Sequence, residues 1–275
     1  MHAETHSASR CSPSVVILGT ITKDIVYLKS KRIVSRGGSP FFAAQVFNGL
    51  RVPCGVVSKV GRNFGSGLSG LRHVNAEGVS YCASTTTVEI WDGAHISASI
   101  RDFTGRIGYS SIPRGFLNPC AFLVSTISDE VDERLLQRIK SRADSLIALD
   151  IQGYLRPSIR GKRAMLLKES QKKLRRSAMY AIKNADILKC NEIEFDAIGS
   201  PKMSMEAKLR YISQLGPGII LVTLGKDGSI LYSDRKLVRV KPIKKFPHIN
   251  TVGAGDRFFF LFWQNSLRIG TLSSQ

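Results

Sequence analysis

Short apolar runs recur along this chain of 275 residues, and most of them are followed by a stretch with helical spacing. A run that is apolar on both faces indicates a strand of a parallel sheet, because parallel connections lay helices over both faces. Such runs lie at 15–19, 54–61, 122–125, 146–150 and 218–225. Helices are expected at 41–50, around Leu68 and Leu71, at 129–142 and at 206–215. The pattern predicts an α/β fold of three layers, with a mostly parallel central sheet between helices.

Two segments depart from this rhythm. Residues 84–110 alternate polar and apolar side chains, with Asp92-Gly93 between two such runs, which is a strong hairpin signal. Residues 21–36 have a similar strand-like composition. We expect both segments to form a small β-sheet that acts as a lid. We therefore predict a disordered tail at 1–13 and a single domain at 14–275 with these two lid segments inserted.

The cysteine content and the apolar runs bear on the cellular compartment. The five cysteines are scattered, and none forms a C-x-x-C pair. This argues against a disulfide framework or a zinc site and favours a reducing cytoplasm. The longest apolar run near the C-terminal end, Phe258 to Trp263, is far too short to span a bilayer. The first dozen residues lack the apolar core of a signal peptide. We predict a cytoplasmic protein that is not bound to a membrane.

The formal net charge of +19 is the most unusual global property. Its densest concentration runs from Arg156 to Lys189, where Tyr180 is the only aromatic residue. Nucleic-acid contact is one interpretation, but a sequence with so few aromatic side chains offers no platform for base stacking. A solvated basic surface that also attracts nucleotides is the interpretation we favour. Nucleic acid is therefore not an expected partner.

Polar side chains follow several of the predicted strands. In parallel sheets, ligands bind beyond the carboxyl ends of the strands. Candidate ligand-binding residues at these ends are Asp24, Asp150, Asn191, Glu194 and the loop 223–228. Asp150 and Gln152 either bind substrate or cap the next segment, and the residues alone do not separate the two.

One more candidate lies late in the chain, where Gly253-Ala254-Gly255 precedes Asp256 and an apolar run. Small residues at the start of a helix let backbone N–H groups crowd around an anion. A carboxylate beside such an anion hole is useful when it takes a proton from a hydroxyl while the N–H groups stabilise a phosphoryl group in transfer. The alternative is a glycine-rich turn capped by an aspartate, and these residues alone do not separate the two.

Five ordered motifs resemble those of the ribokinase-like (PfkB) carbohydrate kinases, over residues 15 to about 268. Residues 250–256 resemble the D-T-x-G-A-G-D signature, and 223–228 resemble the T-x-G-x-x-G loop. Residues 191–194 resemble N-x-x-E, and 61–65 resemble G-x-D-x-x-G. The pair Gly37-Gly38, after Asp24, resembles the substrate-side glycines. Short stretches at 37–42, 57–61 and 150–156 are most similar to the myo-inositol kinase branch and its archaeal relatives.

This resemblance implies an ATP- and Mg²⁺-dependent kinase acting on a hydroxyl of a small sugar or cyclitol, with myo-inositol as one acceptor. It implies Asp256 as general base, and the N–H groups of Gly253, Ala254 and Gly255 as the anion hole. Substrate contacts would come from Asp24, Gly37, Gly38 and Gln152. Nucleotide contacts would come from Asn191, Thr223, Gly225 and Gly228, with Glu194 holding Mg²⁺ through water. The expected oligomeric state is a monomer or a homodimer.

Two departures from the family pattern keep alternatives open. Asn250 replaces the first aspartate of the signature, which removes a negative charge near the anion hole. Only 19 residues follow Asp256, fewer than relatives usually carry. A catalytically impaired homologue that binds ligand without chemistry is therefore the main alternative, followed by a kinase of nucleosides or other sugars. RNA binding through 156–189 ranks below both.

Overall fold

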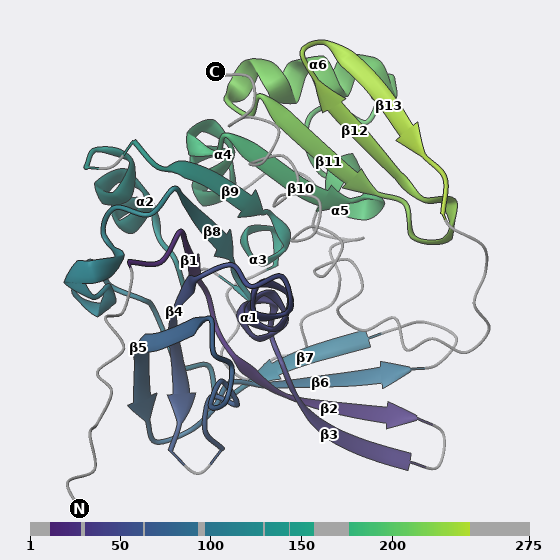
Figure 1. Cartoon of the computed structure of the whole chain (residues 1–275). Coiled ribbons are helices and arrows are strands. Elements are labelled where there is room, and N and C mark those ends of the chain that lie inside the picture. The colour runs from purple at the N-terminus through teal and green to yellow at the C-terminus, as the bar shows by residue number, and fades with distance from the viewer. Residues whose placement is uncertain are drawn as a thin grey trace, which may run out of the picture.

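The structure is a computed structural model that describes residues 12–28, 31–62, 64–92, 97–128, 130–142, 144–156 and 176–242. These residues contain a nine-stranded sheet in the order β13-β12-β11-β10-β9-β8-β1-β4-β5 (Figure 1). All neighbours from β5 to β11 pair in parallel, and β12 and β13 add an antiparallel hairpin at one edge. Its strands are β1 (Val15–Leu18), β4 (Cys54–Gly61), β5 (Val74–Cys82), β8 (Ala121–Ser125), β9 (Leu146–Asp150), β10 (Ile187–Asn191), β11 (Ile219–Thr223), β12 (Ser229–Ser233) and β13 (Lys236–Val240).

Helices cover both faces of this sheet, because successive side chains of each buried strand point to opposite faces. In β1, Val15 and Ile17 pack with α1 (Ser39–Gly49) on one face. Val16 and Leu18 belong to the core on the other face. That second face carries α2 (Glu133–Lys140), α4 (Arg176–Asn184) and α6 (Met205–Leu215), together with the short helices α3 (Gln152–Leu155) and α5 (Glu192–Asp196). Single 3-10 turns lie at Tyr109–Ser111, Arg114–Phe116 and Gly225–Asp227.

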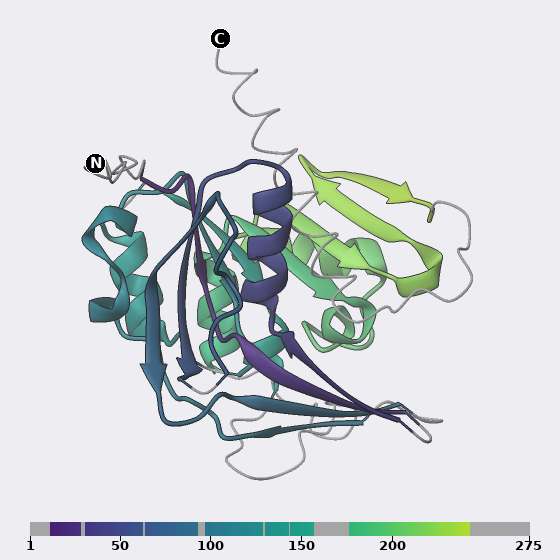
Figure 2. The same ribbon diagram turned by 60° about the horizontal axis from the view of Figure 1, so that its bottom comes forward.

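A second, four-stranded sheet projects from the carboxyl edge of the large one (Figures 1 and 2). Its order is β3-β2-β6-β7, and the central pair β2–β6 is parallel. Tyr27 and Trp91, which are paired across these two strands, stack with ring centroids 5.4 Å apart. The sheet therefore joins two hairpins that lie far apart in the sequence. Its strands are β2 (Thr22–Leu28), β3 (Lys31–Gly37), β6 (Thr87–Asp92) and β7 (Ser97–Arg101).

The predicted α/β class and the mostly parallel sheet are confirmed. The helix expected around Leu68 and Leu71 is wrong, since the described residues 64–73 form turns. Three glycines in this stretch, Gly65, Gly67 and Gly70, have φ values of 67°, 69° and 87°, which end any right-handed helix.

The helix expected over 129–142 is shorter than predicted. The side chain of Asp132 accepts a hydrogen bond from the N–H of Leu135, and α2 begins at the next residue, Glu133. Within the described residues, no helix combines the length and the apolarity required to cross a bilayer.

Candidate active site

The carboxyl ends of four adjacent strands form the edge where the candidate residues gather. Ser125 at the end of β8 is paired with Asp150 at the end of β9, and Asp150 is paired with Lys189 of β10. Asn191, the last residue of β10, is paired with Thr223, the last residue of β11. These residues share one edge because the strands are parallel and in close register.

A buried ion pair occupies the centre of this edge. The Nζ of Lys189 lies 2.8 Å from Oδ2 of Asp150, and the two side chains are only 6% and 1% exposed. The other oxygen, Oδ1, accepts a hydrogen bond of 3.2 Å from the backbone N–H of Gln152. Gln152 is the first residue of α3 and is half-buried beside Asp150. Asp150 is thus held by Lys189 on one side and by the start of α3 on the other.

Asn191 and Glu194 form a reciprocal capping box at the start of α5. The Asn191 side chain accepts from the N–H of Glu194, and Glu194 Oε2 accepts from the N–H of Asn191, both at 2.8 Å. The second oxygen, Oε1, is buried and has no hydrogen-bond partner in the described residues. Burial, with a smaller contribution from the Asp150 carboxylate, raises the pKa of Glu194 to about 6 against the opposing influence of the Lys189 ammonium.

The unpartnered Oε1 suits a water molecule held by Mg²⁺, because such a water donates strong hydrogen bonds to carboxylate oxygens. Mg²⁺ keeps several waters and is bound through one or two carboxylates plus substrate phosphates. In the described chain no group of three or more His, Cys, Asp or Glu side chains could hold a metal ion by itself. Glu194 therefore fits a metal that arrives with a phosphate ligand.

The loop after β11 presents backbone to solvent. Gly225 and Gly228 have φ values of 58° and 93°, and the N–H of Leu224 donates to the carbonyl of Gly228 at 2.8 Å. A Cβ on Gly228 would lie 2.0 Å from the carbonyl oxygen of Val240, so the β12–β13 hairpin requires glycine there. A Cβ on Gly225 would meet nothing within 4 Å. The open space over Gly225 leaves room for a ligand to approach the backbone.

The predicted substrate-side residues meet where β1 leads into the small sheet. Asp24 is 5% exposed, and the hydroxyl of Thr22 donates to its Oδ1 at 2.5 Å. Its other oxygen lies against Gly37, where a Cβ would be 1.8 Å away. Gly38 caps α1 with a φ of 83°, and a Cβ there would lie 2.2 Å from the carbonyl oxygen of Thr20. Both glycines are therefore required by close packing around Asp24 and the end of β1.

The structure thus gathers the described candidates into two groups along one edge. Strands β8, β9 and β10 separate the end of β1 from the end of β11. At the usual strand spacing of about 4.8 Å, the two ends are about 19 Å apart. The predicted residues Gly253, Ala254, Gly255 and Asp256 lie outside the described residues.

Two buried charged residues at this edge were not among the sequence-based candidates. Lys189 interrupts the apolar run of β10, which is a signal visible in the sequence, and the structure shows that it is buried. Glu130 is completely buried, and its carboxylate accepts from the N–H groups of Ile127 and Ser128, each at 2.8 Å. Burial raises the pKa of Glu130. It fixes the loop that follows β8, and no sequence pattern marked it.

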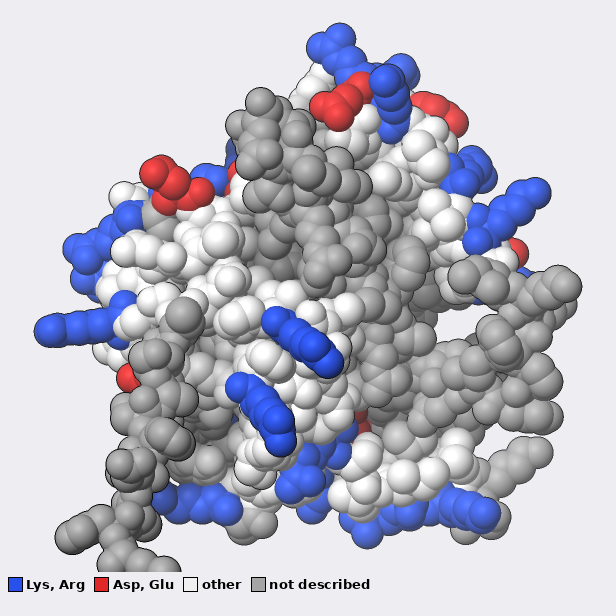
Figure 3. Space-filling model, viewed as in Figure 1, with Lys and Arg blue, Asp and Glu red and all other residues white. Residues whose placement is uncertain are grey.

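Basic side chains are scattered over the face shown in Figure 3 rather than gathered in one stripe. The described end of the basic segment is α4, whose Ala178, Ala181 and Ile182 are buried in the core. Arg176 at its start lies 4.0 Å from Glu133 of α2. This part of the segment is an amphipathic helix that packs on the sheet.

Comparison with protein families places these residues in context. Residues 158–264 match the family model described as pfkB family carbohydrate kinase. This part of the chain is similar to that family. The matched region includes Asn191, Glu194, the loop 223–228 and Asp256.

Individual relatives agree with this match. A nucleoside kinase of Methanothermobacter thermautotrophicus is 35% identical over 88 residues, which are 32% of this chain and 27% of that protein. The chain thus matches about a quarter of that relative's length. A pyrophosphate-dependent kinase of the ribokinase family, complexed with a pyrophosphate analog and myo-inositol, has a TM-score of 0.71 at 20% identity, covering 88% of this chain and 83% of that one. The ribokinase of Arabidopsis thaliana, complexed with ribose and ATP, has a TM-score of 0.63 at 18% identity, covering 90% and 84%. The chain therefore has the ribokinase-like fold.

Proposed function

We propose that this chain transfers a phosphoryl group from ATP to a hydroxyl of a small sugar or cyclitol, with myo-inositol as the first acceptor to test. The observation that carries the proposal is the placement of two residue groups along one sheet edge, near the ends of β1 and β11, which are about 19 Å apart. Asp24 with its two glycines forms one group, and Glu194 with the loop at Gly225 forms the other.

In this proposal Asp256 takes the proton from the acceptor hydroxyl. The N–H groups of Gly253, Ala254 and Gly255 stabilise the charge that develops on the transferred phosphoryl group. When bound, Mg²⁺ neutralises phosphate charge, and Glu194 would hold it through water. These roles agree with the family match, which includes all five residues.

The acceptor would be held by the small sheet and the β1 end. Asp24 would offer its carboxylate to sugar or cyclitol hydroxyls, and Gly37 and Gly38 allow the close packing that positions Asp24 beside the end of β1. Gln152, beside the buried Asp150, offers an amide that both donates and accepts. Closure of the small sheet over the acceptor would exclude water and limit hydrolysis of ATP.

Two similar proteins suggest which other phosphoryl donor and which other acceptor should be tested. The nucleoside kinase match favours a nucleoside as the second acceptor class. The myo-inositol complex is that of a pyrophosphate-dependent enzyme, which makes pyrophosphate the second donor to test.

The test measures phosphorylated product by mass spectrometry with ATP or pyrophosphate as donor, Mg²⁺, and myo-inositol, ribose, fructose or a nucleoside as acceptor. We expect ATP with a polyol to give product. Asp256→Asn should lower turnover by a factor on the order of 10³, the usual contribution of a general base. Asp144→Asn, at an exposed position just before β9, is the matched control and should keep wild-type turnover.

Near wild-type turnover of Asp256→Asn would refute the assignment of the base. Absence of product from every donor and acceptor pair, together with ligand binding by calorimetry, would instead support a catalytically impaired homologue.

A further inference from the structure

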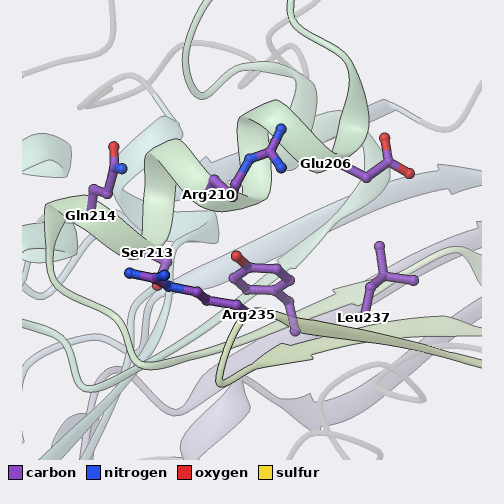
Figure 4. Close-up of a pocket in the computed structure, with 7 residues that line it drawn as sticks. Glu206, Arg210, Ser213, Gln214, Arg235 and Leu237 are labelled. Carbon is purple, nitrogen blue, oxygen red and sulfur yellow. The ribbon is translucent and has the colours of Figure 1, made fainter.

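A separate pocket lies between α6 and the β12–β13 hairpin, at the sheet edge formed by β13. It has a volume of about 590 Å³, within the size range of small-molecule sites. Figure 4 shows side chains of α6 on one side and Arg235 and Leu237 of the hairpin on the other. Its lining residues are Glu206, Arg210, Ser213, Gln214, Tyr232, Arg235 and Leu237.

The pocket has an apolar floor and a polar rim. Tyr232 and Leu237 are directly paired across the hairpin, so their side chains share one face of it. Tyr232 is 5% exposed and belongs to the main core, against which Leu237 packs. The four α6 residues follow helical spacing and lie on one flank of the helix, while Leu209 and Ile212 point into the core.

Two arginines on the rim have no acidic partner among the described residues. Neither Arg210 nor Arg235 forms an ion pair with a carboxylate of the described residues, although Glu206 also lines the pocket. The nearby acid in the hairpin turn, Asp234, accepts instead from the hydroxyl of Ser233 at 3.2 Å. Both guanidinium groups therefore keep their donors for an anion.

The backbone at Arg235 is in an unusual conformation. Asp234 and Arg235 have φ values of 50° and 61°, in a two-residue turn between the paired residues Ser233 and Lys236. Both positions of such a turn favour glycine or asparagine, and a larger residue there costs about 1 kcal/mol. The arginine is thus placed over the pocket at a position where its backbone conformation is unfavourable.

We propose that this pocket binds a small ligand through a phosphate or diphosphate group. A guanidinium group recognises phosphate oxygens in bidentate geometry, and the Tyr232–Leu237 floor would receive the apolar part of an organic phosphate. The pocket is distinct from the candidate active site. The β11–β12 ladder runs from the pair Thr223–Ser229 to the pair Ile219–Ser233. The Gly225 loop and the turn at Arg235 therefore lie at opposite ends of these strands. The inference is independent of the proposed function.

The test is hydrogen–deuterium exchange of the full chain, read by mass spectrometry, with ADP in one arm and inorganic pyrophosphate in the other. We expect slower exchange in 205–215 and 229–240 as ligand is added. In the double variant Arg210→Gln, Arg235→Asn, the ligand concentration needed for half of this protection should rise about tenfold or more, because each charge-assisted hydrogen bond contributes to affinity. Asparagine tolerates positive φ, so the turn is kept.

The matched control is Lys202→Gln, Lys236→Gln, which removes two exposed positive charges outside the pocket lining. It should keep wild-type protection. Protection by both ligands supports recognition through phosphate alone, and protection by ADP alone supports a contribution from the apolar floor. Absence of protection in both arms, or equal protection in the wild type and the arginine variant, overturns the proposal. Kinase turnover of the arginine variant is measured in parallel. Turnover equal to that of the wild type shows that the proposed function stands whether or not the pocket binds phosphate.

Discussion

Glu194 provides a direct test of the charge balance at the sheet edge. This residue is 5% exposed, and burial raises its pKa from 4.5 to about 6. Between these two values the folded protein holds a proton that the unfolded chain has released. The free energy of unfolding therefore falls as pH rises from 4.5 through 6, and the deficit persists at higher pH. A shift of this size corresponds to roughly 2 kcal/mol.

The variant Glu194→Gln removes this titration while its amide oxygen still accepts from the N–H of Asn191. We expect the wild type to lose roughly 2 kcal/mol of stability relative to the variant between pH 4.5 and 7. Urea denaturation followed by circular dichroism across this range measures the difference. Glu192→Gln, at an exposed position of the same helical turn, controls for the loss of one charge.

The reasoning fails if the difference between wild type and Glu194→Gln does not change with pH. It also fails if the wild type gains stability relative to the variant as pH rises, because that is the sign expected of a carboxylate stabilised by its surroundings. The first result would mean that the Lys189 ammonium, 2.8 Å from Asp150, offsets the cost of burying Glu194, and the second that it outweighs this cost.

Two further substitutions test other contacts of the site. Lys189→Met leaves the carboxylate of Asp150 buried without its partner, and we expect a loss on the order of 3 kcal/mol in urea denaturation. A loss below about 1 kcal/mol would contradict the buried ion pair. Gly37→Ala places a methyl group 1.8 Å from the Asp24 carboxylate, and overpacking of this kind costs about 1–3 kcal/mol. Gly49→Ala, with nothing within 4 Å of its Cβ, should be nearly neutral by thermal melting, and equal melting temperatures for the two variants would refute the close approach at Gly37.

Much of the fold could be predicted because each buried strand carries its own signal. The apolar run 54–61 predicts β4 over the same residues, and 146–150 does the same for β9. Leu68 shows where this reasoning fails. It is buried, as a helix prediction would have it, but glycines with positive φ on either side hold it in a turn. Hydrophobic spacing identifies a buried residue, and backbone conformation then decides the element.

The site was less accessible to prediction, because its charges act through partners that are distant in sequence. Asp150 was a candidate from its position after a strand, but its partner Lys189 is 39 residues away, and the pair is defined only by strand register. The Asn191–Glu194 capping box is local, and its spacing was visible in the sequence. Glu194 Oε1 has no hydrogen-bond partner in the described residues because of how α5 packs, and no local pattern encodes that packing.

The parallel ladder between β2 and β6 has a consequence for the order of folding. It pairs Lys23 with Thr87 and so encloses α1, β4 and β5 within a loop of about 60 residues. Each hairpin can form by itself, but their junction has to wait until the large sheet has drawn both roots together. The small sheet should be the last part of the chain to assemble, and its amides should be the earliest to exchange when the native protein opens.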